Sequence, residues 1–185
     1  MRTFSGIALM LLVSAGLASA QISRGNVFFG YSYYNTYLQP NQRGALNGFQ
    51  ASLEGRILPF VGIVADFNSN YGTLANFTPA GTCAMGMICS SPSVSVHQEN
   101  SLFGPRVSFP AGKFRPFAEA LFGAAFMSTN GFGSDTSLAT AYGGGIDYRI
   151  VPHIGWRVQA DYVRSSLFSR TEGNARISTG IVLRF

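Results

Sequence analysis

The stretch that decides the fold is "RISTGIVLRF", residues 176–185. Along this stretch, apolar or β-branched residues alternate with polar or small ones. This two-residue period predicts a β-strand with one apolar and one polar face. Chain ends are ordinarily polar and frayed, so a period that persists to the last residue predicts that the segment is held in a sheet. The residues of the apolar face are Ile177, Thr179, Ile181, Leu183 and Phe185.

The same alternation recurs in seven further segments, which cover residues 26–38, 47–56, 60–68, 101–109, 116–126, 141–149 and 155–163. Three connections are short and contain a proline, at 57–60, 110–114 and 150–154. Four are longer and polar, at about 39–46, 69–95, 127–136 and 164–174. Short turns at one end and long loops at the other are typical of outer-membrane barrels. The sequence therefore predicts an all-β fold, an eight-stranded antiparallel up-and-down transmembrane β-barrel.

The first twenty residues indicate export. Arg2 precedes an apolar run at residues 7–13, and small residues close the segment at Ala18-Ser19-Ala20. This is the layout of a secretory signal peptide, and the run is shorter than the roughly 20 residues that a spanning helix needs. We therefore expect a signal peptide over residues 1–20 and a barrel domain over residues 21–185 in the cell outer membrane.

Composition agrees with lipid contact. Charged residues make up 11% of the chain and aromatic residues 14%, whereas soluble domains carry about 25% charged residues. The net charge is +5, but no cluster of Lys or Arg occurs, so we expect no nucleic-acid partner. If an exported, charge-poor chain without long apolar helices spans a membrane, its backbone N–H and C=O groups must form their hydrogen bonds in a closed sheet.

The charges of the eight segments all fall on one strand face. Arginines and carboxylates are nearly equal in number, which allows pairing in a narrow lumen, where an unpaired charge would be costly. A soluble lipocalin-like barrel would place its charges outside instead. We expect a lumen ion-pair network of Glu54, Arg56, Asp66, Arg106, Glu119, Asp147, Arg149, Arg157, Asp161, Arg176 and Arg184.

Two cysteines lie close together in the longest loop. In an oxidising compartment, Cys83 and Cys89 are predicted to form a local disulfide, and the apolar residues around them make this loop a candidate surface for a ligand. A zinc site would need further Cys or His ligands nearby, and the sequence offers none.

Catalytic candidates are few. The stretch "HQENS" places His97, Glu99 and Ser101 on one face if the strand extends that far, but residues two apart are about 6.6 Å apart along a strand, too far for a direct relay without cross-strand help. His153 falls in a short turn. No phosphate-binding loop, H-E-x-x-H motif or EF-hand loop occurs, so we expect no cofactor and no enzymatic activity.

The signal peptide, the eight alternating segments and the terminal "STGIVLRF" together resemble the small outer-membrane barrels of the OmpA/OmpX type. The resemblance implies contact with outer-membrane lipid and assembly by the barrel assembly machinery, with Ile181, Leu183 and Phe185 as the assembly signal. Nothing follows Phe185, so we expect the peptidoglycan-binding domain of full-length OmpA to be absent.

An eight-stranded barrel has an interior just wide enough for side chains to fill. The expected function is therefore structural or surface interaction without catalysis. The alternatives are a narrow channel for small solutes and an enzyme that modifies lipid A.

Overall fold

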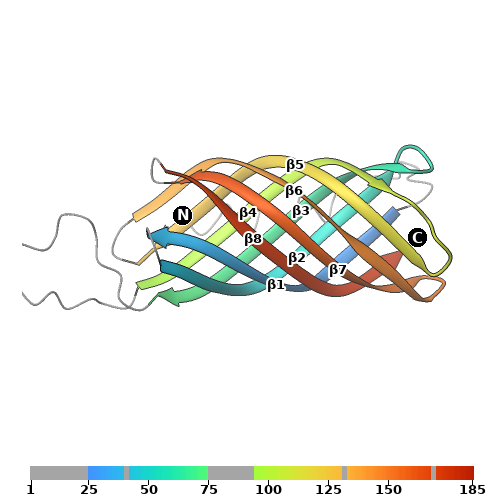
Figure 1. The fold of residues 1–185 in the computed structure, drawn as a ribbon, viewed down its shortest axis with the longest axis horizontal. Helices are drawn as coiled ribbons and strands as arrows, with labels where there is room; N and C mark the ends of the chain where they lie inside the picture. The colour runs from blue at the N-terminus through green and yellow to red at the C-terminus, as the bar shows by residue number, and fades with distance from the viewer. Residues whose placement is uncertain (1–24, 40–41, 75–93, 131–132, 168–169) are drawn as a thin grey trace, which may run out of the picture.

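A computed structural model describes residues 25–39, 42–74, 94–130, 133–167 and 170–185 (Figure 1). Each strand is antiparallel to the next, and β8 pairs with β1, which closes the sheet into a barrel. Among the described residues, no helix is long and apolar enough to cross a membrane. The strands are β1 (Gly25–Gln39), β2 (Gln42–Arg56), β3 (Val61–Leu74), β4 (Val94–Ser108), β5 (Phe114–Thr129), β6 (Gly133–Val151), β7 (Ile154–Leu167) and β8 (Arg170–Arg184).

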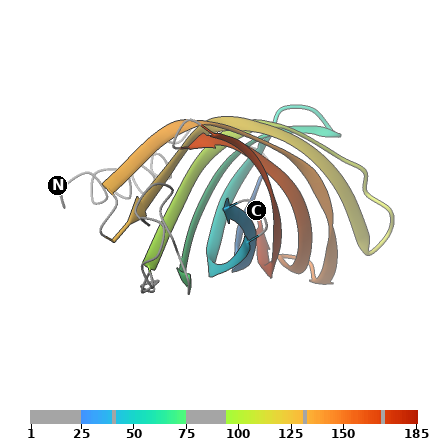
Figure 2. The ribbon, with the colours of Figure 1, turned by 60° about the vertical axis from the view of Figure 1, so that its left-hand side comes forward.

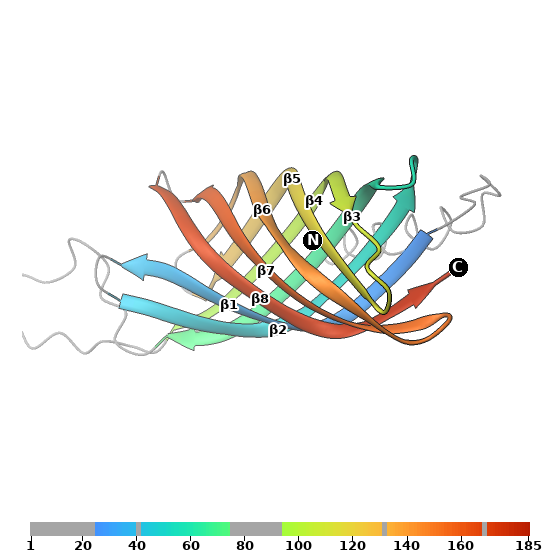
Figure 3. The same cartoon turned by 45° about the vertical axis from the view of Figure 1, so that its right-hand side comes forward.

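The "RISTGIVLRF" stretch closes the barrel. It forms most of β8 and pairs with β1 from Asn26↔Arg184 to Tyr34↔Arg176, and the two strands run side by side in Figure 3. The pairing continues to Phe185, whose N–H donates to the carbonyl of Gly25 at 3.1 Å while the Gly25 N–H donates back at 2.9 Å. The predicted fold class is confirmed.

The strands are strongly staggered around the barrel. Tracing cross-strand partners once around from Gly25 returns to β1 at Asn35, ten residues further along (35 − 25 = 10). Closing a sheet with such a stagger requires the strands to tilt against the barrel axis. Figure 1 shows this slant, and Figure 2 shows the curved wall that it produces.

Most strands extend beyond the predicted segments at the end distant from Phe185. β2 begins at Gln42, β4 at Val94 and β6 at Gly133. The connections expected at about 39–46, 127–136 and 164–174 are therefore mostly paired strand. At these strand ends the outward residues are largely polar while the inward ones mix apolar and polar side chains, so the apolar period of the outer face disappears although the backbone ladder continues. The prediction of four long loops is wrong for these three, and residues 75–93 of the fourth lie outside the described residues.

The two faces of the wall have opposite character. Large apolar side chains are exposed on the outer face, and these include the aromatic residues Tyr31, Tyr33, Phe103, Phe109, Tyr142, Tyr148, Trp156, Tyr162 and Phe185. The inner face carries the buried polar and charged side chains together with one buried apolar cluster. That cluster includes Leu46, Val96 and Met127.

Candidate functional site

The lumen holds one continuous network of charged and amide side chains, to which all eight strands contribute. Each strand supplies its inward-facing residues, because side chains alternate between the two faces of a sheet. The members are Asn26, Gln50, Glu54, Asp66, Arg106, Arg115, Glu119, Asp147, Arg157, Gln159, Asp161, Arg176 and Arg184.

Glu54 is the most connected carboxylate. It accepts hydrogen bonds from Arg106 Nη1 and Arg115 Nη2, both at 3.0 Å, and from the Asn26 amide at 2.8 Å. Arg106 reaches across to Glu119, with Nε to Oε2 at 2.7 Å. Because each acid meets an arginine or an amide, the burial of these charges is compensated.

Arg176 forms the second centre of the network. Its Nη1 donates to Asp66 Oδ1 at 2.7 Å, and its Nη2 and Nε donate to Asp161 Oδ2 at 2.7 and 2.9 Å. The Gln159 amide donates to Asp161 at 2.8 Å and to Glu119 at 2.7 Å, which links this centre to Arg106. Gln50 also donates to Asp66.

Two arginines enclose an aromatic ring. The guanidinium carbons of Arg106 and Arg157 lie 4.3 and 4.7 Å from the centre of the Phe117 ring, within the range of a cation–π contact. Arg157 also forms a two-bonded pair with Asp147, at 2.6 and 3.1 Å. Gly145 leaves room for the ring, since a Cβ atom there would lie 2.8 Å from Phe117.

The structure places eight of the eleven predicted lumen charges fully inside: Glu54, Asp66, Arg106, Glu119, Asp147, Arg157, Asp161 and Arg176. Arg56 and Arg184 are partly exposed at the barrel end, 3.9 Å from Glu54 and 3.5 Å from Asp147. Arg149 lies outside the network, exposed, with its Nη2 donating to the Gly112 carbonyl at 3.2 Å. Arg149 keeps the register of Asp147 and pairs with Gly155, but it lies near the end of β6, where its side chain is exposed and does not reach the network.

Several lumen residues were missed from the sequence. Arg115 lies one residue before the segment predicted at 116–126, although it has the parity of Glu119. A second group consists of amides and hydroxyls, in which Asn68 accepts from Asn70 at 2.7 Å and from Asn100 at 3.0 Å. Asn68 donates in turn to Ser32 at 2.9 Å. These residues follow the inward alternation of their strands. Because their side chains are uncharged, the sequence provides no opposite charge from which a partner could be inferred.

The side chains at the centre of the lumen are sealed from solvent. Arg106, Arg157 and Arg176 are 1%, 0% and 0% exposed. A water-filled pore would leave the arginines that line it partly exposed, so this arrangement is that of a filled barrel. The buried apolar cluster adds to the filling, because Val96 and Met127 lie near the ends of β4 and β5 that are distant from the short turns.

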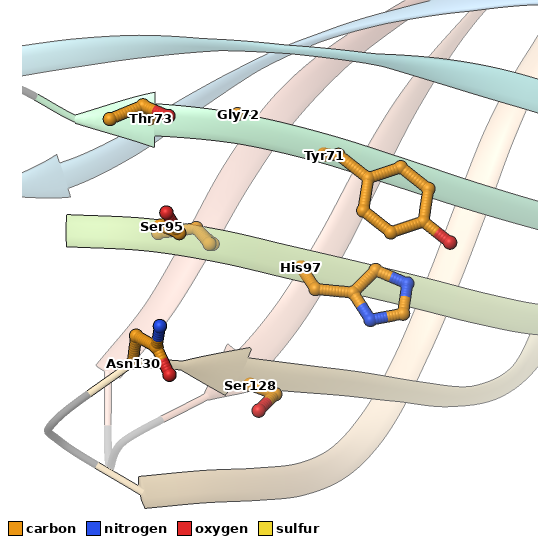
Figure 4. A pocket seen from close by; sticks show the side chains of 8 residues that line it. Tyr71, Gly72, Thr73, Ser95, His97, Ser128 and Asn130 are labelled. Carbon is orange, nitrogen blue, oxygen red and sulfur yellow. The ribbon is translucent and has the colours of Figure 1, made fainter.

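A second candidate site lies on the outer wall. Tyr71 of β3, His97 of β4 and Ser128 of β5 are direct cross-strand neighbours, and Figure 4 shows their side chains beside one open hollow. Its volume is about 450 Å³, and Thr73, Ser95 and Asn130 also line it. The Tyr71 and His97 rings are stacked, with centres 4.2 Å apart and planes 8° apart.

The predicted row His97, Glu99 and Ser101 does lie on one face of β4, and His97 Nε2 is 3.3 Å from Glu99 Oε1. The side chains therefore bridge the gap that backbone spacing alone suggested was too wide. Ser69 of the neighbouring strand, rather than Ser101, meets the same nitrogen at 3.0 Å. A Ser-His-carboxylate relay uses both ring nitrogens, one for each partner, so this cluster lacks relay geometry.

The longer strands also put two charges on the outer face. Glu99 and Arg164 point outward near the strand ends distant from Phe185, whereas the predicted segments had no outward charge. His153 is exposed in the turn between β6 and β7. Within the described ranges, no group of three or more His, Cys, Asp or Glu side chains could hold a metal ion. Cys83 and Cys89 lie outside the described residues.

Comparison with known proteins places the fold. No protein-family model and no curated protein matches the sequence. The crystal structure of Neisserial surface protein A is similar over 87% of this chain and 97% of its own, with a TM-score of 0.65 and 12% identity. Ail of Yersinia pestis, solved with the heparin analogue sucrose octasulfate, is similar over 88% and 98%, with a TM-score of 0.56 and 14% identity. The chain therefore has the fold of the small eight-stranded outer-membrane β-barrels that its sequence resembles.

Proposed function

We propose that this chain is a non-enzymatic protein of the cell outer membrane, with a structural role or a role in surface interaction. The observation that carries the proposal is the sealed lumen, in which Arg106, Arg157 and Arg176 are almost wholly buried and ion-paired. A barrel that is filled in this way offers its outer wall and its loops to other molecules. The outer wall meets lipid, and a surface ligand would bind beyond the lipid.

The proposal includes export through a signal peptide over residues 1–20 and assembly by the barrel assembly machinery. Ile181, Leu183 and Phe185 are the proposed assembly signal, and all three side chains are half-exposed on the outer face of the closing strand. The short turns would then face the periplasm. Ail was solved with a heparin analogue, and this supports a surface ligand for barrels of this shape.

Two measurements test the proposal. The detergent-extracted protein should migrate differently on a gel before and after boiling, because an intact barrel resists unfolding by the detergent, and it should require detergent to stay in solution. In planar bilayers the refolded protein should give no steady conductance. Extraction without detergent would refute the membrane location, and a steady conductance would refute the sealed lumen.

A specific observation keeps the narrow channel as the second candidate. Several buried polar atoms, including Arg157 Nη1, Ser52 Oγ and Ser178 Oγ, have no hydrogen-bond partner within the described part of the chain. Buried polar atoms of this kind are normally satisfied by ordered water. A chain of such waters would conduct small ions in brief openings, which single-channel recordings would separate from a steady pore.

The third candidate, modification of lipid A, is tested by replacing His97 with Ala. We expect the lipid A profile of cells that express this variant to match that of cells expressing the unaltered protein. The reason is that Ser69 and Glu99 approach the same ring nitrogen. A difference between the two profiles would establish an enzymatic role.

A further inference from the structure

We propose that the hollow on the outer wall, formed by the row Tyr71–His97–Ser128 and the residues around it, binds an uncharged sugar ring. The proposal rests on the outer-membrane location proposed above, because that location puts the hollow beside the glycolipid headgroups and glycans of the cell surface. It assigns a ligand class to a part of the barrel that the sealed lumen does not involve.

The hollow lies near the end of the apolar band on the outer wall. The outward residues of β4 are apolar from Val107 to Phe103 and become polar from Ser101 through Glu99 and His97. β3 shows the same change after Phe67. Since the apolar band of a transmembrane barrel ends where the hydrocarbon ends, the hollow lies just beyond the hydrocarbon, at the level of the headgroups.

Two stacked aromatic rings give the hollow a flat surface. Tyr71 and His97 stack on each other across the strands, so one face of the His97 ring is covered. Its other face turns toward β5, where the neighbour is the small Ser128. The His97 side chain keeps 31% of its surface exposed. A pyranose ring has an apolar face of C–H bonds that packs on such a flat, half-exposed aromatic surface.

Polar side chains form the rim of the hollow. Hydroxyl groups of Thr73, Ser95 and Ser128 and the amide of Asn130 line the hollow. These groups both donate and accept hydrogen bonds, as sugar hydroxyls do. The volume of about 450 Å³ lies within the range of about 300–1,000 Å³ found for ligand pockets. Among the residues that the structure describes, no Lys or Arg lines the hollow, which favours a neutral sugar over a phosphate group.

Neighbouring side chains hold the Tyr71 and His97 rings in place. Ser69 Oγ lies 3.1 Å from the Tyr71 hydroxyl and 3.0 Å from His97 Nε2, and Glu99 lies 3.3 Å from the same nitrogen. These contacts fix both rings before any ligand binds, which lowers the ordering cost of binding. A ligand as small as one sugar ring in an open hollow should have a dissociation constant on the order of millimolar.

The test uses the two histidines of the chain. His97 lies in the hollow and His153 in a turn at the opposite end of the barrel, so the second residue is an internal control. Histidine-labelled protein, refolded in phosphatidylcholine nanodiscs, is titrated with methyl β-D-glucopyranoside while the ring resonances are followed by NMR. We expect saturable shifts for His97 and none for His153. Sorbitol, which has hydroxyls but no ring face, should give no saturable shift.

Two variants make the test decisive. Ser128→Leu fills the hollow and should raise the half-saturating sugar concentration at least tenfold, whereas Thr140→Leu, an outward residue on β6 away from the hollow, should leave it unchanged. The gel shift on boiling checks that both variants are folded, and it tests the barrel independently of the sugar. Absence of a His97 shift, equal shifts at both histidines, or equal binding by sorbitol would overturn the proposal.

A second nanodisc experiment identifies the source of the sugar. If the ring belongs to a membrane glycolipid, nanodiscs that contain lipopolysaccharide should shift the His97 resonances without any added sugar, and Ser128→Leu should abolish that shift. If the ring belongs to a soluble glycan, the His97 resonances in these nanodiscs should match those in phosphatidylcholine nanodiscs, and only the added sugar should shift them.

Discussion

Replacement of Arg176 by Gln is the perturbation that most directly tests how the lumen is held together. Arg176 is fully buried and is the arginine that joins Asp66 and Asp161, at 2.7 Å each. The shorter, uncharged Gln would leave two carboxylates buried without their cation. Removing one partner of a buried ion pair costs about 3–5 kcal/mol, so we expect a loss of about 4 kcal/mol in the free energy of unfolding.

The assay is urea unfolding of the barrel in lipid vesicles, followed by the fluorescence of Trp156, the single tryptophan of the chain. With a denaturant slope of about 2 kcal/mol per molar urea, the unfolding midpoint should fall by about 2 M. Arg149→Gln is the matched control, since that arginine is exposed and its side chain donates to the backbone carbonyl of Gly112. Its midpoint should change by less than about 0.3 M, in keeping with ordinary surface substitutions.

A rescue variant separates charge from packing. Arg176→Gln combined with Asp66→Asn and Asp161→Asn removes the two uncompensated charges and keeps the side-chain volumes nearly constant. Because a neutral replacement of a buried ion-pair group is often tolerated, at least half of the lost stability should return. If Arg176→Gln behaves like Arg149→Gln, or if the triple variant is as unstable as the single one, the ion pairs do not stabilise the barrel as argued.

Three other substitutions have definite expected outcomes. Gly145→Ala should cost about 1–3 kcal/mol in urea unfolding, because its Cβ would collide with the backbone carbonyl of Val158 and would also lie 2.8 Å from the Phe117 ring. Phe117→Leu should restore only the part of that loss that comes from the ring. Gly112→Ala should cost about 1 kcal/mol, since Gly112 has φ +64° in open space, whereas Gly112→Asn should cost less because Asn adopts this conformation more readily. Phe185→Ser should lower the amount of assembled barrel in cells while refolding of the purified chain in vesicles stays within about twofold; equal loss in both settings would refute a role in assembly.

Alternation predicts the strands wherever one face of the wall meets an apolar environment. The row Phe103, Val107 and Phe109 was therefore visible in the sequence. The extension of β4 back to Val94 was not, because the outward residues Ser95 and His97 meet water or headgroups. The backbone ladder continues past the apolar band, and hydrophobic periodicity cannot report it.

The alternation of inward and outward residues along a strand predicts which charges point into the lumen, but it does not predict which of them pair with each other. Glu54 and Arg106 are 52 residues apart in sequence, and Arg176 and Asp66 are 110 apart. Their pairing depends on the stagger of the strands, which is set by eight separate registers. Arg149 shows the limit of this alternation: it keeps the register of Asp147, yet it lies exposed near the end of β6 and donates to the Gly112 carbonyl instead of joining the network.

The outer hollow could not be predicted, since it depends on a contact between two strands. Tyr71 and His97 meet only because β3 and β4 pair in the register that sets them opposite each other. Ser69, which completes the cluster, belongs to a part of the chain that the sequence predicted to be loop. Only the row on β4 itself, His97 and Glu99, could be found from spacing along a single strand.

The cross-lumen pairs also explain how one register is selected. A slip of β8 by one residue would exchange the two faces of that strand, so that Arg176 would point into hydrocarbon and Ile177 into the charged lumen. Arg176 can meet Asp66 of β3 and Asp161 of β7 together only when the strands between them are correctly aligned. Buried charge costs free energy unless it is paired, and this cost penalises the misaligned barrels. The ion pairs therefore help to select one register of the strands, and in the proposed location the apolar outer wall would favour insertion into the membrane.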